Sequence, residues 1–354
     1  MTILSRYLAH AVWGGTLGAL GVLVALSAFV LFVGQGDHVG TGSYTMWKAL
    51  QFVAASMPQQ AYELFPMAVL LGSLFALGNL AAGNELTVIR AAGVSTWALA
   101  RALLLGALVL ALVCLALGEL LAPNAQRYAA QMKAAAINQR VTVVDRQGVW
   151  AKEGEVFINV RSIDDERRLG RVNLYEFDRD GQLVRAATAS GAVHVGGGWQ
   201  LQDLRETRLD AEGTVAASAP SRDWQSSIDP DLLESLTGEY DTLSALALAR
   251  YSSFLRGNRL ESNPVDIYLW SRVAVPLNVV LMVLLALPFA FGPLRSTGAG
   301  QRVVIGILIG IAFYAVTKTL LHSGTVFGLD PLLTNFLPTL VLASLTAAAV
   351  ARLR

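Results

Sequence analysis

The segment AVWGGTLGALGVLVALSAFVLFVG, residues Ala11–Gly34, contains no Lys, Arg, Asp, Glu or His. A helix of about 20 apolar residues crosses a hydrocarbon core about 30 Å thick, and a helix satisfies its own backbone polar groups there. Five more charge-free apolar runs follow, and the two shortest need flanking residues to span: Leu64–Asn84, Ala102–Gly118, Val273–Gly292, Val303–Thr317 and Pro331–Ala351. The sequence therefore predicts an α-helical membrane protein with six transmembrane helices, three before and three after a long polar insert.

Most of the charged residues lie in that insert. The range Ala122–Asp266 holds 17 of the 27 Lys and Arg residues and 21 of the 26 Asp and Glu residues, although the net charge of the chain is only +1. The insert is therefore predicted to be a water-exposed module, and its balanced charge excludes the basic footprint of a nucleic-acid-binding protein. The single cysteine, Cys114, excludes an internal disulfide.

The short loops between the runs differ in positive charge. The loops and termini on one side carry arginines: Arg6, Arg90, Arg101, Arg295, Arg302, Arg352 and Arg354. The short loops on the other side carry only Lys48, with Lys318 near the edge of a run. Because cytoplasmic loops are enriched in Lys and Arg, we predict that both termini are cytoplasmic. The insert is then periplasmic, if the membrane is a bacterial inner membrane.

The insert has the pattern of β-structure. Short alternating segments are separated by turns that contain Gly and Asp: Val141–Val144, Val149–Lys152, Val156–Val160, Val172–Phe177, Leu183–Ala189, Ala192–Val195 and Trp199–Leu204. Short strands at spacings of about ten residues predict an all-β sandwich or jelly roll. Ser244 can cap a helical linker that runs to about Arg256. The predicted domains are helices 1–3 over residues 1–121, the β-domain over 122–266 and helices 4–6 over 267–354.

A short amphipathic helix is predicted in the loop between the second and third runs. In Asn84–Gly93, Asn84 is a plausible cap, Glu85 favours the helix dipole, and Leu86 and Ile89 share one side with Gly93. Such a helix either packs under its own bundle, which is the commoner case, or engages a separate ATPase subunit.

Catalysis in this chain is not expected. The sequence contains no G-x-x-x-x-G-K-[ST] phosphate loop, no H-E-x-x-H and no C-x-x-C, and its histidines are scattered. The apolar runs also lack the ionisable residues of a proton-driven pump. We expect no cofactor in this chain.

Three segments carry a resemblance to a known family. They are Leu64–Gly72 (LFPMAVLLG), Leu77–Ser95 (LGNLAAGNELTVIRAAGVS) and Phe291–Ser296 (FGPLRS), continued by Gln301–Ile307 and Phe313-Tyr314. The chain resembles the lipopolysaccharide-export permease family, LptF/LptG, over nearly its whole length. The resemblance implies a heterodimer of two six-helix permeases, docked on two copies of the ATPase LptB, which uses ATP and Mg. It also implies a partner, LptC, with one helix and a periplasmic jelly roll, and lipopolysaccharide as the substrate.

The resemblance also implies roles for particular residues. In the ATPase-coupling helix, Glu85 and Arg90 would make polar contacts while Leu86 and Ile89 fill the partner's groove. Candidate walls of the lipid cavity lie on the first and fifth spans: Leu26, Phe29, Val30, Phe32, Ile311, Phe313 and Tyr314. Candidate partners for lipid phosphates are Lys133, Lys48, Arg127, Lys318, Arg272 and His38. Relatives often carry lysines near the end of the first helix, but no Lys or Arg occurs here between Arg6 and Lys48.

Each of these residues has a simpler alternative role, namely ordinary packing for the apolar ones and anchoring at the membrane interface for the cations. Two rival functions also stay open. One is an ABC-type permease for another lipid or a lipoprotein, and the other is a membrane scaffold without transport activity.

Overall fold

The computed structural model describes residues 3–137, 149–165, 168–178, 180–195, 198–210, 213–226, 228, 240–291 and 299–352. The chain forms two compact units. The first comprises Met1–Asp37, Val53–Arg127 and Asn263–Arg354 and contains most of the apolar helices. The second comprises His38–Phe52 and Tyr128–Ser262 and contains the β-sheet.

Six helical segments in the described part of the chain are long and apolar enough to cross a membrane, as predicted. They are built from α1 (Ile3–Gly34), α2 (Met46–Ala82), α4 (Thr96–Ala116), α8 (Asn263–Phe291), α9 (Ala299–Phe327) and α10 (Pro331–Ala351). The third segment continues from α4 through a π-helical turn (Leu117–Leu121) into α5 (Ala122–Ala136). Shorter elements are η1 (Gly36–His38), α3 (Glu85–Ala91), η3 (Tyr240–Thr242) and α7 (Ala245–Gly257), which Ser244 caps.

Five of these helices extend beyond the charge-free runs, and α1 and α4 thereby include Arg6 and Arg101. Helix α2 begins 18 residues before Leu64 and so includes Glu63. Likewise α8 includes Arg272, and α9 includes Lys318. The described helices therefore carry ionisable residues that the apolar runs do not contain.

Small residues bring the membrane helices close together. A Cβ atom on Gly72 of α2 would collide with the backbone of Gly15 and Thr16 on α1. A Cβ on Gly106 of α4 would lie 3.0 Å from the Cβ of Ala9 on α1. Lipid tails are as apolar as leucine side chains, so the hydrophobic effect does not drive helices together in a membrane. Close packing at small residues, with its dispersion contacts, stabilises helix association instead. The core around them includes Leu70, Leu77, Leu103, Val279 and Met282.

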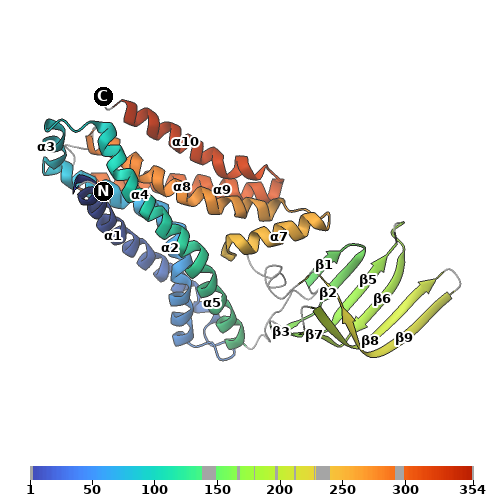
Figure 1. Cartoon of the computed structure of the whole chain (residues 1–354). Coiled ribbons are helices and arrows are strands. Elements are labelled where there is room, and N and C mark those ends of the chain that lie inside the picture. The colour runs from blue at the N-terminus through green and yellow to red at the C-terminus, as the bar shows by residue number, and fades with distance from the viewer. Residues whose placement is uncertain are drawn as a thin grey trace. The chain divides into compact units, whose positions relative to one another are not determined.

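The second unit contains one antiparallel sheet, which confirms the inserted all-β domain (Figure 1). Its strands are β1 (Val149–Glu153), β2 (Val156–Val160), β3 (Ile163–Asp165), β4 (Arg168–Leu169), β5 (Val172–Phe177), β6 (Leu183–Ala189), β7 (Gly191–Val195), β8 (Gly198–Asp210) and β9 (Gly213–Trp224). The strand order is β1-β2-β5-β6-β8-β7-β4-β3, and β9 pairs with β8. The predicted strand Val141–Val144 lies outside the described residues.

Along strand β8, the face of the sheet that is buried changes at Asp203. Strands β6 and β7 pair with successive halves of β8 and are separated by Ser190, whose hydroxyl donates to Asp203 Oδ2 at 2.9 Å. Asp203 has a left-handed backbone (φ 47°). Before this point Trp199 and Leu201 are buried, and after it Leu204 is buried instead. The period of two is therefore broken at Asp203, so one strand supplies inward-facing residues to both halves of a curled sheet.

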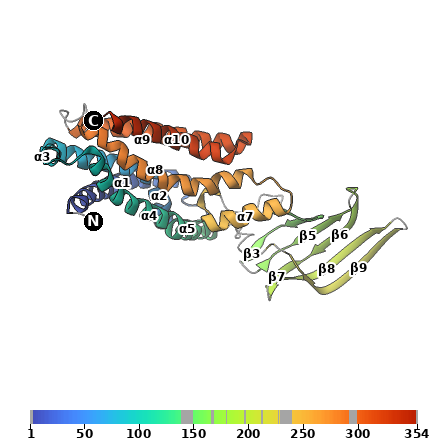
Figure 2. The same cartoon turned by 45° about the horizontal axis from the view of Figure 1, so that its top comes forward.

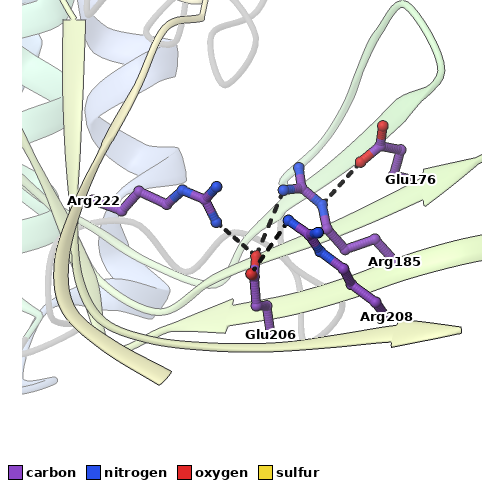
Figure 3. Close-up of polar contacts among 5 residues, drawn as sticks. All are labelled: Glu176, Arg185, Glu206, Arg208 and Arg222. Carbon is purple, nitrogen blue, oxygen red and sulfur yellow. Dashed lines mark hydrogen bonds and ion pairs between the residues drawn. The ribbon is translucent and has the colours of Figure 1, made fainter. Parts of the chain in front are cut away.

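A cluster of charges occupies the inward face beyond Leu204. Glu206 accepts from Arg222 at 2.7 Å and lies 3.6 Å from Arg185 and 3.7 Å from Arg208 (Figure 3). Arg185 also pairs with Glu176 at 2.8 Å. The Glu206 side chain is only 10% exposed, so this one carboxylate holds three guanidinium groups and joins β6, β8 and β9.

Replacing Glu206 by glutamine should loosen this part of the sheet. The change removes the negative charge that three arginines share, and hydrogen bonds to charged groups contribute about 1.5–3 kcal/mol each before screening. We expect faster hydrogen exchange in β8 and β9 of the full-length protein, measured by mass spectrometry. Asp223→Asn is the control on β9, since Asp223 accepts only one described hydrogen bond, a long one from Gln200 (3.3 Å). Equal exchange in both variants would contradict the role of Glu206.

Candidate coupling surface, lipid groove and buried cations

Helix α3 is a short helix placed between α2 and α4. Asn84 occupies the N-cap position as predicted, but it has a left-handed backbone (φ 60°) and its side chain makes no capping hydrogen bond. Gly93 ends it as predicted, with φ 87° and a backbone N–H donated to the carbonyl of Arg90. In Figures 1 and 2, α3 lies at the end of the bundle where α1 begins and α10 ends.

The side chains of α3 divide into an inward and an outward set. Leu86 is 1% exposed in the bundle core, and the partly buried Ile89 packs against the same core. Glu85 accepts a hydrogen bond from the Tyr7 hydroxyl at 2.5 Å. Val88 is 67% exposed. Leu86 and Ile89, predicted to fill a partner's groove, therefore hold α3 on its own bundle.

The outward set of α3 includes Arg90 and Val88. The Arg90 guanidinium lies over the Phe291 ring, 5.3 Å from its centre. Val88 is the exposed apolar residue of this helix, and sequence reasoning missed it because it falls off the apolar stripe. Val88 and Arg90 therefore lie on the exposed side of α3.

A groove of about 600 Å³ runs beside the contact between α1 and the second half of α2. Its α1 wall contains Gly14, Gly15 and Gly18, its α2 wall contains Gly72 and Phe75, and Ile307 of α9 also lines it. A Cβ on Gly14 or Gly18 would meet nothing within 4 Å, so these two glycines leave open space on the α1 wall. Asn79 is the polar side chain among its lining residues.

The predicted wall residues do not line this groove. On α1, Leu26, Phe29 and Val30 are each more than 60% exposed, while Phe32 is half-buried. On α9, Ile311 and Tyr314 are exposed, but Phe313 packs against the bundle core. These exposed apolar side chains face outward from the bundle, as expected of surfaces that contact lipid or another apolar helix. Their role as cavity walls stays a prediction.

Two of the predicted phosphate partners lie on neighbouring helices. Lys48 Nζ donates to Ser43 Oγ at 3.0 Å, and Lys133 Nζ lies 5.0 Å from the centre of the Phe52 ring. Lys48 and Phe52 are four residues apart on α2, so the structure brings both lysines to one face of that helix. His38 is exposed on η1. Arg127, on α5, belongs to the other compact unit.

Arg272 differs from the other candidate cations, because it is buried inside the helix bundle. It is 4% exposed, lies 5.0 Å from the centre of the Tyr62 ring and donates to the Gly118 carbonyl at 3.4 Å. Gly118 belongs to the π-helical turn after α4. The guanidinium therefore joins α2, α4 and α8, and its burial argues against the predicted contact with a lipid phosphate.

Lys318 is paired within the bundle. Its Nζ atom lies 2.9 Å from Glu63 Oε2 on α2, and the Lys318 side chain is 33% exposed. Lys318, one of the predicted phosphate partners, is therefore held by a carboxylate of α2.

These features define a class of protein: a multi-pass membrane protein with six apolar spans, a water-exposed β-domain between two membrane halves and a short helix displayed at one end. The family described as lipopolysaccharide export system permease LptF/LptG matches residues 6–352. The chain belongs to this family.

Relatives in two bacteria agree with that assignment. The lipopolysaccharide export system permease protein LptG of Haemophilus influenzae is 33% identical over 340 residues, which cover 96% of this chain and 95% of the relative. The LptG protein of Escherichia coli K12 is 32% identical over 340 residues, covering 95% and 94%. The segments Phe65–Met67, Arg90–Val94 and Phe291–Ser296 resemble LptG more closely than LptF, and both relatives are LptG proteins. The resemblance drawn from the sequence is confirmed.

Proposed function

We propose that this chain is one of two permease subunits of an ABC-type exporter that extracts lipopolysaccharide from the inner membrane. A separate ATPase supplies the energy, and the β-domain passes the lipid to a periplasmic β-bridge toward the outer membrane. The observation that carries the proposal is the family match over residues 6–352, because it covers both membrane halves and the insert. Neither an unrelated lipid nor a scaffold role accounts for a match of that extent.

The proposed partners follow from this assignment. They are an LptF-like permease that completes a heterodimer, an LptB-like ATPase dimer that uses ATP and Mg, and an LptC-like single-span protein with a jelly roll. Helix α3 is the proposed contact with the ATPase: Leu86 anchors it on the bundle, while Val88 and Arg90 lie on its exposed side. The groove of the ATPase that accepts Val88 would be apolar, would match the shape of the valine side chain and would exclude water when the two proteins bind.

The proposed orientation places α3 and both termini in the cytoplasm. The arginine-rich loops support it, since positive charge is retained on the cytoplasmic side. Helix α3, the start of α1 and the end of α10 share one end of the bundle, so a single orientation satisfies all three (Figure 2). The β-domain is then periplasmic.

Substitutions on α3 test the contact with the ATPase. We expect Val88→Asp and Glu85→Lys each to lower the amount of co-purified ATPase at least tenfold and to lower lipopolysaccharide release from proteoliposomes in parallel. A buried carboxylate, or a reversed charge, opposes association at such an interface by about 1.4 kcal/mol or more.

Two controls separate docking from folding. Val195→Asp places the same carboxylate at a valine of similar exposure (61%) on the β-domain. Tyr7→Phe removes the hydrogen bond to Glu85 without changing any charge. Normal ATPase recovery and release in Val88→Asp and Glu85→Lys would remove α3 from the coupling role.

A further inference from the structure

An ion pair joins α2 and α9 within the membrane bundle. Lys318 Nζ lies 2.9 Å from Glu63 Oε2, and Gln59 Nε2 donates to the other carboxylate oxygen of Glu63 at 3.0 Å. The Tyr314 ring, one turn before Lys318 on α9, has its centre 5.8 Å from the ammonium. Glu63 therefore has a donor at each oxygen, and only one of those donors is charged.

The pair lies well inside the membrane segment. Lys318 precedes the end of α9 at Phe327 by about 14 Å of helix rise, compared with a hydrocarbon half-thickness of about 15 Å. Charges at that depth are costly and often mark the path of an ion or a polar substrate. An apolar pair of similar volume usually stabilises a bundle at least as well as a buried ion pair. Packing alone therefore does not explain these two residues.

The rest of the α2–α9 contact is built from small residues. Gly306 of α9 lies against Leu71 and Leu74, and Gly310 lies against Met67. Beyond Gly310 the described polar contacts between the two helices converge on Glu63, which pairs with Lys318 and has a side-chain hydrogen bond with Tyr314, while Ile311 and Val316 are exposed. The polar contacts of this half of α9 with α2 thus depend on one carboxylate, and its charged partner is Lys318.

We propose that Glu63 is an internal competitor for Lys318, which binds a phosphate group of the transported lipid. In the lipid-free state the Glu63 carboxylate neutralises the ammonium and ties α9 to α2. A phosphate carries more charge and three acceptor oxygens, so it can replace the carboxylate as the partner of Lys318. Glu63 then keeps its uncharged hydrogen-bond partners Gln59 and Tyr314, and the ionic tie between α2 and α9 is released. This inference rests on the proposed function.

Binding to the full complex in nanodiscs tests the proposal. The probes are bisphosphorylated lipid A, lipid A stripped of both phosphates, and inorganic phosphate. Glu63→Gln should lower the Kd for bisphosphorylated lipid A about five- to tenfold, because the competitor is gone, and leave the Kd for stripped lipid A unchanged. Lys318→Gln should raise the Kd for the bisphosphorylated form, and adding Glu63→Gln to it should have no further effect.

Glu63→Asp is a second variant, for the case that Glu63→Gln does not fold. It keeps the charge but shortens the side chain by one methylene, so it should lower the same Kd by a smaller factor. An unchanged Kd in a folded Glu63 variant, or an equal change for both lipids, would show a structural tie and overturn the proposal. Displacement of the lipid by millimolar inorganic phosphate would contradict a lipid headgroup as the ligand.

The binding measurements distinguish a failure of the proposed function from a failure of the competition between Glu63 and phosphate. If the wild-type complex binds neither form of lipid A, the proposed function fails and this inference fails with it. If the wild-type complex binds bisphosphorylated lipid A and the Glu63 variants bind it equally well, only the competition is wrong.

Discussion

Replacing Gly72 by leucine should nearly abolish folded protein. A Cβ at position 72 would overlap backbone atoms of Gly15 and Thr16, and backbone cannot move aside as a flexible side chain can. Overpacking a core by single methylenes costs about 1–3 kcal/mol, and here α1 and α2 would have to separate along their contact. Gly72→Ala should lower the melting temperature, and Gly72→Leu should eliminate the monodisperse peak in fluorescence-detected size-exclusion chromatography.

Gly21→Leu is the matched control on α1, since a Cβ there would meet nothing within 4 Å. It should leave the chromatographic peak and the melting temperature close to those of the wild type. A monodisperse Gly72→Leu protein with unchanged melting would refute the close approach of α1 and α2.

The second large effect is expected at Arg272. Replacing it by methionine removes a guanidinium that is 4% exposed, stacks on Tyr62 and donates to the Gly118 carbonyl. A desolvated cation–π contact contributes about 2 kcal/mol or more, and the carbonyl would also lose a donor. We expect a clear fall in the melting temperature of the purified protein and a lower yield.

Arg272→Lys distinguishes the positive charge from the shape of the group. Lysine keeps the charge but lacks the planar fork that reaches the ring and the carbonyl together, so it should recover only part of the loss. Arg101→Met, at an exposed position of α4, is the control. Equal melting temperatures for Arg272→Met and Arg101→Met would show that the buried arginine contributes nothing to stability.

The sequence predicted the membrane helices because a long charge-free apolar run is long enough to span the membrane, and in lipid a helix satisfies its backbone polar groups. It missed the full length of α2, α8 and α9, since a rule that stops at the first charge ends before Glu63, Arg272 and Lys318. Each of these residues has its partner on another helix, and the partner is what makes the charge tolerable. A single sequence does not show which helices are neighbours.

In the β-domain, too, the sequence predicted some strands and missed others. Strands with clear alternation, such as Val156–Val160 and Val172–Phe177, were predicted with the boundaries that the structure has. Strand β9 was missed because Gly213–Trp224 is rich in Ala and Ser and is mostly exposed, so it has no buried face to impose a period of two. The change of buried face at Asp203 was not predicted either, although the spacing of Trp199, Leu201 and Leu204 in the sequence already breaks the period of two.

At the candidate site the sequence predicted the short helix between α2 and α4 but not which of its side chains are exposed. It identified α3, yet the outward apolar residue is Val88, while Leu86 is buried. It named Lys318 and Arg272 together as cations at span edges, whereas one is paired with a carboxylate and the other is enclosed by three helices. Which side of a short helix faces its own bundle is decided by tertiary packing, and local periodicity does not contain that information.

Native mass spectrometry of the tagged chain, extracted gently from its own membranes, tests the central claim most directly. The proposal of an ATPase-driven lipopolysaccharide permease predicts recovery with a second six-span subunit, two ATPase copies and bound lipopolysaccharide. Recovery with the ATPase and a different lipid would retain the mechanism and change the substrate. Recovery without any ATPase, under conditions that preserve other ABC complexes, would contradict the account.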